Sequence, residues 1–159
     1  MSRFDFEGVR PLLTGGDALL ILPPFAGYER PSLGLHVLKA VAHAQGLKVD
    51  ILYANAHFAG VFTEDRYTSV CYAPTGVLSG EKVFAPMAFP GKVPSFNDPE
   101  TERLAAEWIE GIAVFLASLD YPVIGCNTMF EQLTCSLAIL DAVKRIRPDV
   151  TTILGGAQC

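Results

Sequence analysis

The chain has 159 residues, half of them hydrophobic and 18% charged, which is the composition of one folded domain and excludes a disordered segment. A formal net charge of −5 argues against nucleic acid or an anionic membrane as the main partner. No apolar run approaches the roughly 20 residues of a membrane span, and the first residues lack the apolar core of a signal peptide. The four cysteines have no zinc or iron–sulfur spacing. We therefore expect a cytoplasmic protein with free thiols.

The first structured stretch follows a lead-in of residues 1–16. Ala18–Leu22 is an apolar run too short for a helix and is bounded by Pro23-Pro24, which predicts a strand buried on both faces. After a loop, Ser32 is the expected N-cap of a helix over residues 33–44. One face of this helix is polar and carries His36, Lys39 and His43, and the other is apolar, with Leu35, Leu38, Val41 and Ala42.

A second strand and a long insert come next. Lys48–Tyr53 predicts the strand, with Val49, Ile51 and Tyr53 alternating against Lys48, Asp50 and Leu52. Residues 55–97 form an insert in which short helices are expected near 64–72 and 77–86. We expect this insert to pack against the sheet edge or a partner domain because of its seven aromatic residues: Phe58, Phe62, Tyr67, Tyr72, Phe84, Phe89 and Phe96.

The last third of the chain repeats the strand–helix pattern. Asn97-Asp98-Pro99-Glu100 begins a helix that is expected to reach Leu119, with Leu104, Trp108, Ile112, Phe115 and Leu119 facing inward. Pro122–Cys126 predicts a third strand, and Val150–Leu154 a fourth. Between them Thr128 and Glu131 have the spacing of a capping box that opens a helix ending at Arg147. Its candidate core residues are Leu133, Leu137, Leu140, Val143 and Ile146.

Strands that alternate with helices predict a three-layer α/β fold with a doubly wound parallel sheet. Right-handed crossovers favour the strand order 2-1-3-4. Ligands then bind at the carboxyl ends of strands one and three, between the loops Pro23–Ser32 and Cys126–Gln132. A strand that ends in Gly155-Gly156 should be followed by a helix that covers the sheet, so we expect the chain to be the truncated, N-terminal part of a longer protein.

Three motifs carry a resemblance to a known family. They are Pro23-Pro24 with Pro31-Ser32-Leu33-Gly34-Leu35, then Ile124-Gly125-Cys126-Asn127-Thr128-Met129-Phe130-Glu131-Gln132, then Ile153-Leu154-Gly155-Gly156-Ala157-Gln158-Cys159. Together they resemble the N-terminal cobalamin-binding domain of radical S-adenosylmethionine enzymes. The chain is most similar to the radical SAM C-methyltransferases of RiPP (bacteriocin) maturation, which modify ribosomally made peptides. The insert agrees through Tyr53-Ala54-Asn55-x-His57-Phe58-Ala59 and Leu78-Ser79-Gly80-Glu81, so the resemblance covers nearly all of residues 17–159.

The resemblance implies a Rossmann-like domain over residues 17–159 that binds cobalamin. Because the loop Pro23–Pro31 contains no histidine, we expect the cofactor to be base-off, without a protein histidine on cobalt. The resemblance also implies a downstream radical SAM barrel, which would bind S-adenosylmethionine and a [4Fe–4S] cluster, and a precursor peptide as substrate. The Cys-x-x-x-Cys-x-x-Cys cluster motif of that barrel is absent from residues 1–159. We therefore expect no S-adenosylmethionine cleavage by this chain alone.

The resemblance assigns cofactor-binding roles but no catalytic or metal-ligating residue. His57, in Asn55-Ala56-His57-Phe58-Ala59-Gly60, only weakly imitates the Asp-x-His-x-x-Gly motif of other cobalamin domains and follows the second strand instead of the first. Some of the candidate residues have a simpler explanation. A capping box alone would explain Thr128 with Glu131, a plain turn would explain Gly155-Gly156, and an ordinary N-cap would explain Ser32. The candidates are Pro24, Phe25, Ser32, Leu33, Gly34, Cys126, Asn127, Thr128, Met129, Phe130, Glu131, Gln132, Gly155 and Gly156.

Two other functions stay open from the sequence. The chain could be a non-catalytic interaction domain that has lost its cofactor and docks a partner protein or peptide through its aromatic insert. It could also be a generic nucleotide-binding α/β domain, although the missing G-x-G-x-x-G makes this less favoured. Cobalamin absorbance on the purified protein would distinguish a cobalamin-binding domain from these two alternatives.

Overall fold

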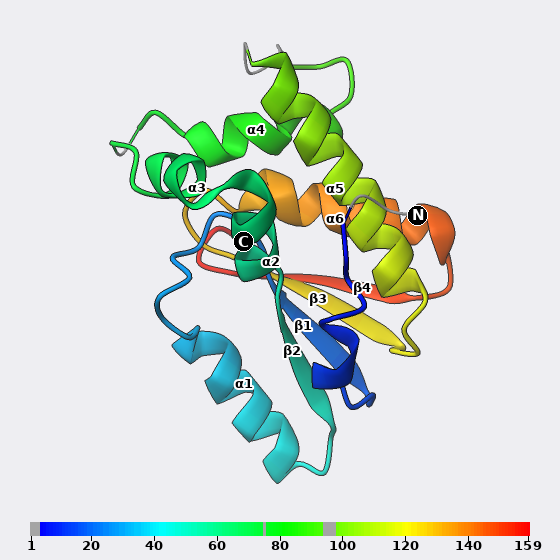
Figure 1. Cartoon of the computed structure of the whole chain (residues 1–159). Coiled ribbons are helices and arrows are strands. Elements are labelled where there is room, and N and C mark those ends of the chain that lie inside the picture. The colour runs from blue at the N-terminus through cyan, green and yellow to red at the C-terminus, as the bar shows by residue number, and fades with distance from the viewer. Residues whose placement is uncertain (1–3, 75, 94–97) are drawn as a thin grey trace.

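A computed structural model describes residues 4–74, 76–93 and 98–159. Its four parallel strands form one sheet in the order β2-β1-β3-β4, as expected from the sequence (Figure 1). The elements are η1 (Arg10–Leu12), β1 (Ala18–Leu22), α1 (Leu33–Ala44), β2 (Val49–Tyr53), α2 (Ala54–Phe62), α3 (Glu64–Cys71), α4 (Ser79–Ala88), α5 (Pro99–Ala117), β3 (Val123–Thr128), α6 (Leu133–Ile146) and β4 (Thr151–Gly156).

Helices cover the two faces of the sheet unequally. α2, α5 and α6 lie over one face, whereas α1 lies on the other side, along β2 (Figure 1). Leu20 of β1 is consequently half-buried and Ile153 of β4 is 50% exposed, both beside a cavity on the α1 side. The expectation that β1 is buried on both faces is therefore wrong for its α1 side. Among the described helices, none is long and apolar enough to cross a membrane.

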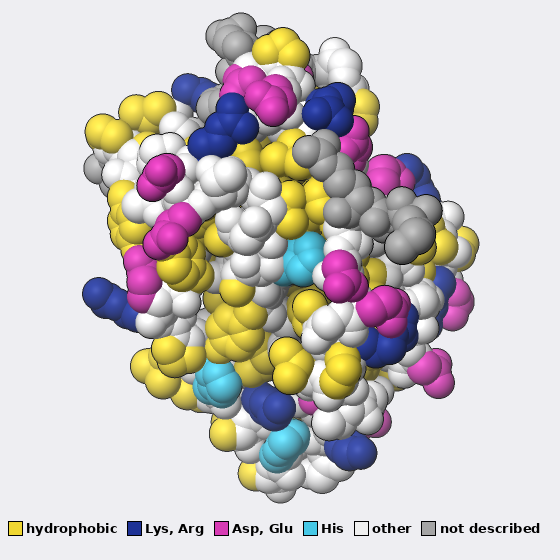
Figure 2. Space-filling view, viewed as in Figure 1, with side chains coloured by type: hydrophobic (Ala, Val, Ile, Leu, Met, Phe, Trp, Pro, Cys, Tyr) yellow, Lys and Arg dark blue, Asp and Glu magenta, His cyan; other side chains and the backbone are white. Residues whose placement is uncertain are grey.

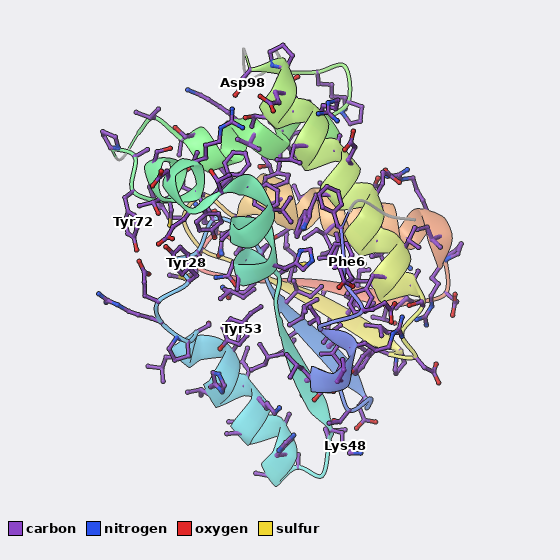
Figure 3. The ribbon with its side chains drawn as sticks, in the orientation of Figure 1. Phe6, Tyr28, Lys48, Tyr53, Tyr72 and Asp98 are labelled. Carbon is purple, nitrogen blue, oxygen red and sulfur yellow. The ribbon has the colours of Figure 1, made fainter. Side chains whose placement is uncertain are left out.

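The orientation of α1 differs from the expected one. Leu35 is buried, but Leu38 and Val41 are exposed to solvent. The polar face turns toward β2 instead, where His36 Nε2 lies 2.8 Å from the Tyr53 hydroxyl, between helix and strand (Figure 3). The helix lies over an edge strand with polar partners, so burying its apolar face is not what positions it.

β2 also buries a different set of residues. Asp50 and Leu52 are buried, although they alternate with the residues that the pattern marked as apolar. The Asp50 carboxylate accepts hydrogen bonds from the Tyr121 hydroxyl and from the Thr14 backbone N–H. Burial raises the pKa of Asp50, but these hydrogen bonds outweigh it and hold that pKa below its ordinary value. A buried carboxylate with such partners is stable in its charged form.

The expected helix starts are confirmed at α1 and α5. Ser32 Oγ accepts the Leu35 N–H, and Asp98 Oδ1 accepts N–H groups in the first turn of α5. The inward residues of α5 are all buried, as are the large residues that follow it. These are Leu104, Trp108, Ile112, Phe115, Leu119 and Tyr121.

The insert packs against the domain's own helices. Its expected helices correspond to α3 and α4; α2 was not predicted, because it follows β2 directly and its N-cap has no side-chain hydrogen bond. Four of its aromatic residues are buried and two, Tyr72 and Phe89, are exposed, while Phe96 and Asn97 lie outside the described residues. The buried four gather around Phe25 of the loop after β1: Phe58, Phe62, Tyr67 and Phe84.

α6 begins later than expected and buries a different face. It starts at Leu133, and Thr128 is instead the last residue of β3, so the predicted capping box is wrong. Leu140 and Val143 are buried as expected, but Leu133 and Leu137 are only partly buried and Ile146 is exposed. α6 packs between β3, α4 and α5, and this close packing buries mainly small residues: Thr134, Cys135, Ser136, Ala138 and Ala142.

Candidate functional site

Two adjoining cavities lie at the switch point between β1 and β3. The edge cavity, of about 510 Å³, lies between the loop after β1 and the loop after β3. The sheet cavity, of about 560 Å³, lies between α1 and the open face of the sheet. Leu33, Gly34 and Asn127 line both cavities and form their junction. The two cavities therefore lie where the strand order predicts that a ligand would bind.

Most candidate residues meet at these cavities. Phe25, Ser32 and the segment 129–132 line the edge cavity, and Cys126, Gly155 and Gly156 line the sheet cavity. Pro24 and Thr128 line neither, and both are buried. Several further lining residues were not predicted from the sequence, because they come from the insert or from residues of α1 that face the sheet cavity. These are Cys71 and Tyr72 in the edge cavity and Val37 and Leu38 in the sheet cavity.

The insert holds the loop after β1. The Tyr67 hydroxyl donates to the Ala26 carbonyl at 2.6 Å, and the Tyr72 hydroxyl donates to Glu29 Oε1 at 2.6 Å. The hydrogen bond to Glu29 raises the pKa of Tyr72 to about 12. Tyr28 similarly donates to Glu64 of α3, on the same side of the molecule as Tyr72 (Figure 3). One wall of the edge cavity is thus fixed by α3.

Gln132 joins the two loops across the switch point. Its Nε2 donates to the Pro23 carbonyl at 2.7 Å, and its Oε1 accepts the Met129 N–H at 2.9 Å. Gln132 is fully buried, so these bonds form away from water, where they are strongest. Met129 and Phe130, in contrast, are 53% and 54% exposed. The loop after β3 therefore presents two large apolar side chains on a fixed backbone.

Glycines give the site open space. A Cβ added at Gly34 or Gly155 would meet no atom within 4 Å, although both line the sheet cavity. Gly156 differs, because it has a φ of +126° and a Cβ there would collide with the backbone of Thr128. Gly155 is therefore free to border a ligand, and Gly156 keeps β4 close to β3.

The two cysteines at the site are not activated nucleophiles. Burial raises the pKa of Cys71 to about 11 and raises that of Cys126 as well, so both thiols stay protonated and are weak nucleophiles. The Asn127 side chain, at the junction, makes no hydrogen bond within the described residues. Within residues 4–74, 76–93 and 98–159, no group of three His, Cys, Asp or Glu side chains could hold a metal ion.

One face of the molecule carries both apolar and charged side chains. Figure 2 shows hydrophobic side chains across its middle and at its left edge, with charged and histidine side chains among them. A scan against models of known protein families finds no match, and searches of curated proteins and of solved structures return no significant match.

Proposed function

We propose that this chain is a cobalamin-binding module of a radical SAM methyltransferase that modifies a ribosomally made peptide. The observation that carries the proposal is the pair of cavities that meet at Leu33, Gly34 and Asn127. A corrinoid has two parts, a broad flat ring and a nucleotide tail, and two joined cavities suit such a ligand. Each is within the roughly 300–1,000 Å³ that is common for ligand sites.

The residues at the site fit the chemistry of this ligand. Leu33, Met129 and Phe130 are large, apolar and exposed at the edge cavity, where a ligand would bury them and exclude water. The unpartnered amide of Asn127 can donate to or accept from an amide or phosphate. Gly34, in the first turn of α1, lets a ligand approach a helix N-terminus, which favours a phosphate. When bound, the corrinoid supplies the cobalt centre that carries a methyl group.

The rest of the activity would need a further domain. The radical SAM barrel, with its cluster and S-adenosylmethionine, would follow residue 159 and would act on the peptide. In that arrangement this chain binds and orients the cofactor and keeps water from it. Four free thiols fit a reducing compartment, and we place the protein in the cytosol.

A second candidate is an interaction domain without a cofactor. Its support is the exposed apolar surface of α1, where Val37, Leu38 and Val41 are all more than half exposed. The aromatic insert, which first suggested partner docking, supports it less, because Phe58, Phe62 and Phe84 are buried in the domain's own core. The cavities and their glycines are not needed for such a function.

The test is co-elution of hydroxocobalamin with the purified chain in gel filtration, read by its visible absorbance. Gly34→Phe fills the junction of the cavities without meeting protein atoms near the new Cβ, so we expect binding to be lost while the fold is kept. Gly60→Phe is the matched control, because Gly60 is also helical and open but lies outside both cavities. Absence of cobalamin from the wild-type peak would leave the interaction domain as the better account.

A further inference from the structure

Two glutamates cap each other's helices. The carboxylate of Glu131, in the loop before α6, accepts the backbone N–H groups of Gly80 and Glu81 in the first turn of α4. The carboxylate of Glu81 accepts the N–H groups of Leu133 and Thr134 in the first turn of α6, at 2.9 and 2.8 Å. Each helix thus begins on a carboxylate that belongs to the other helix or to the loop before it.

Neither helix has a side-chain cap from its own N-cap residue. The N-cap residues are Leu78 for α4 and Gln132 for α6, and neither accepts a hydrogen bond from the first turn. A helix N-terminus leaves backbone N–H groups unsatisfied and carries a partial positive charge. α4 and α6 pack against each other, so each exchanged carboxylate satisfies donors that the packing removes from water. The exchange joins the insert to the core.

Gly80 and Glu131 lie so close together that their contact fixes the backbone of Glu131. A Cβ added at Gly80 would lie 3.0 Å from both the Cβ and the carbonyl oxygen of Glu131 and 2.6 Å from Cδ2 of Phe25, so only glycine fits. Glu131 itself has a φ of +67°, a left-handed conformation that residues other than glycine rarely adopt. It is also buried, at 6% exposure. The hydrogen bonds to α4 hold Glu131 where its intrinsic preference would not.

This conformation sets the wall of the edge cavity. Met129 and Phe130 lie between Thr128, fixed in β3, and Glu131, fixed on α4. Their side chains line the cavity, and that of Glu131 turns to α4. A loop fixed at both ends presents its apolar side chains in one arrangement, which lowers the entropy cost of binding a ligand against them.

We infer that Glu81 and Glu131 are positioning residues of the ligand site. Their carboxylates act through the loop of residues 128–132: Glu81 lies outside the edge cavity, and Glu131 borders that cavity but directs its carboxylate to α4. The inference rests on the proposed function for the identity of the ligand. It gives the insert a role in that function: α4 fixes the shape of the edge cavity. A helix cap that served stability alone would leave the loop and the ligand affinity unchanged.

The experiment compares Glu131→Gln and Glu81→Gln with Asp98→Asn in the full chain. All three remove the charge of a capping carboxylate and keep an oxygen acceptor, but Asp98 caps α5, away from both cavities. Three quantities are measured for each: the urea midpoint, hydrogen exchange of the backbone amides of residues 129–132, and the affinity for hydroxocobalamin by equilibrium dialysis.

We expect a lower urea midpoint in all three variants. Only the two glutamate variants should show loop amides that exchange at least tenfold faster and cobalamin bound at least tenfold more weakly. Unchanged loop exchange in both, or an equal rise in Asp98→Asn, would overturn the inference. If the wild type binds no cobalamin, the proposed function fails, while the exchange data still decide whether the two glutamates fix the loop.

Discussion

Trp108 donates its indole N–H to Nδ1 of His57 at 3.0 Å. Because Nδ1 is the acceptor, the imidazole proton lies on Nε2, which donates to the Asp5 carbonyl at 3.1 Å. The ring of Phe6 stacks on the same imidazole, with 4.1 Å between centroids. A neutral histidine with both nitrogens occupied thus fastens the N-terminal segment to α2 and α5, and Phe6 lies beside α5 in Figure 3. His57 is therefore not available as a cobalt ligand.

The protein should lose stability as His57 becomes protonated. Burial lowers the pKa of His57 below its ordinary value of 6.5, against an opposing hydrogen bond to Asp5. The unfolded chain therefore binds a proton that the folded chain resists, and the free energy of unfolding should fall as pH drops below about 6.5. His57→Gln should flatten this fall between pH 7 and 5.

Trp108 is the only tryptophan, so its fluorescence reports the same event. It should titrate with a midpoint below 6.5 in the wild type and lose that transition in His57→Gln. The control is His43→Gln, on the exposed end of α1. An equal change of the pH profile in both variants would show that the Trp108 contact is not its source.

Ile112→Asp should destabilise the fold severely. Ile112 is fully buried in α5, and a carboxylate there would have no partner, at a cost of at least about 3 kcal/mol. Val114→Asp is the matched control two residues away, because Val114 is 62% exposed and its substitution should cost under about 1 kcal/mol. Urea unfolding gives both values. Similar midpoints would mean that the buried face of α5 has been assigned incorrectly.

Tyr121→Phe should lower the stability of the protein toward acid unfolding. Its hydroxyl donates to the buried Asp50 carboxylate, so its removal should cost about 1–3 kcal/mol at pH 7. The lowered pKa of Asp50 stabilises the fold above its ordinary value of 3.8, and this contribution is lost as pH falls through the folded pKa. In the variant that pKa rises, and the acid-unfolding midpoint should move to higher pH.

Tyr53→Phe is the control for this experiment, because the Tyr53 hydroxyl binds the exposed His36 instead of a buried carboxylate. An acid midpoint that stays at the wild-type value in Tyr121→Phe would remove Asp50 from the account of acid stability.

The sequence predicts the sheet well because its strands are short segments that alternate with helices. Ala18–Leu22 follows from an apolar run between turn residues, and the strand order follows from right-handed crossovers. The orientation of α1 does not follow from the sequence pattern, since a helix beside an edge strand can turn polar residues toward that strand when it offers a partner such as Tyr53.

Tertiary contacts also override the local signals at the site. Thr128 and Glu131 match a capping box by spacing, yet Glu131 caps α4, which lies fifty residues earlier in the chain. Gln132 is predicted from the sequence as a site residue and lines the edge cavity, but its bond to Pro23 depends on the packing of two distant loops. Neither contact can be predicted from the spacing of residues along the chain.

The electron paramagnetic resonance spectrum of cob(II)alamin with the purified chain tests the central claim most directly. If the two cavities hold the cofactor, the residues around them would offer cobalt no imidazole nitrogen, and a nucleotide tail bound apart from the ring would not supply one. Among the described residues, no histidine lines either cavity. We therefore predict a bound spectrum without nitrogen hyperfine splitting, identical in wild type and His57→Ala. A spectrum that keeps the splitting of free cob(II)alamin, or one whose splitting disappears in His57→Ala, would contradict the account.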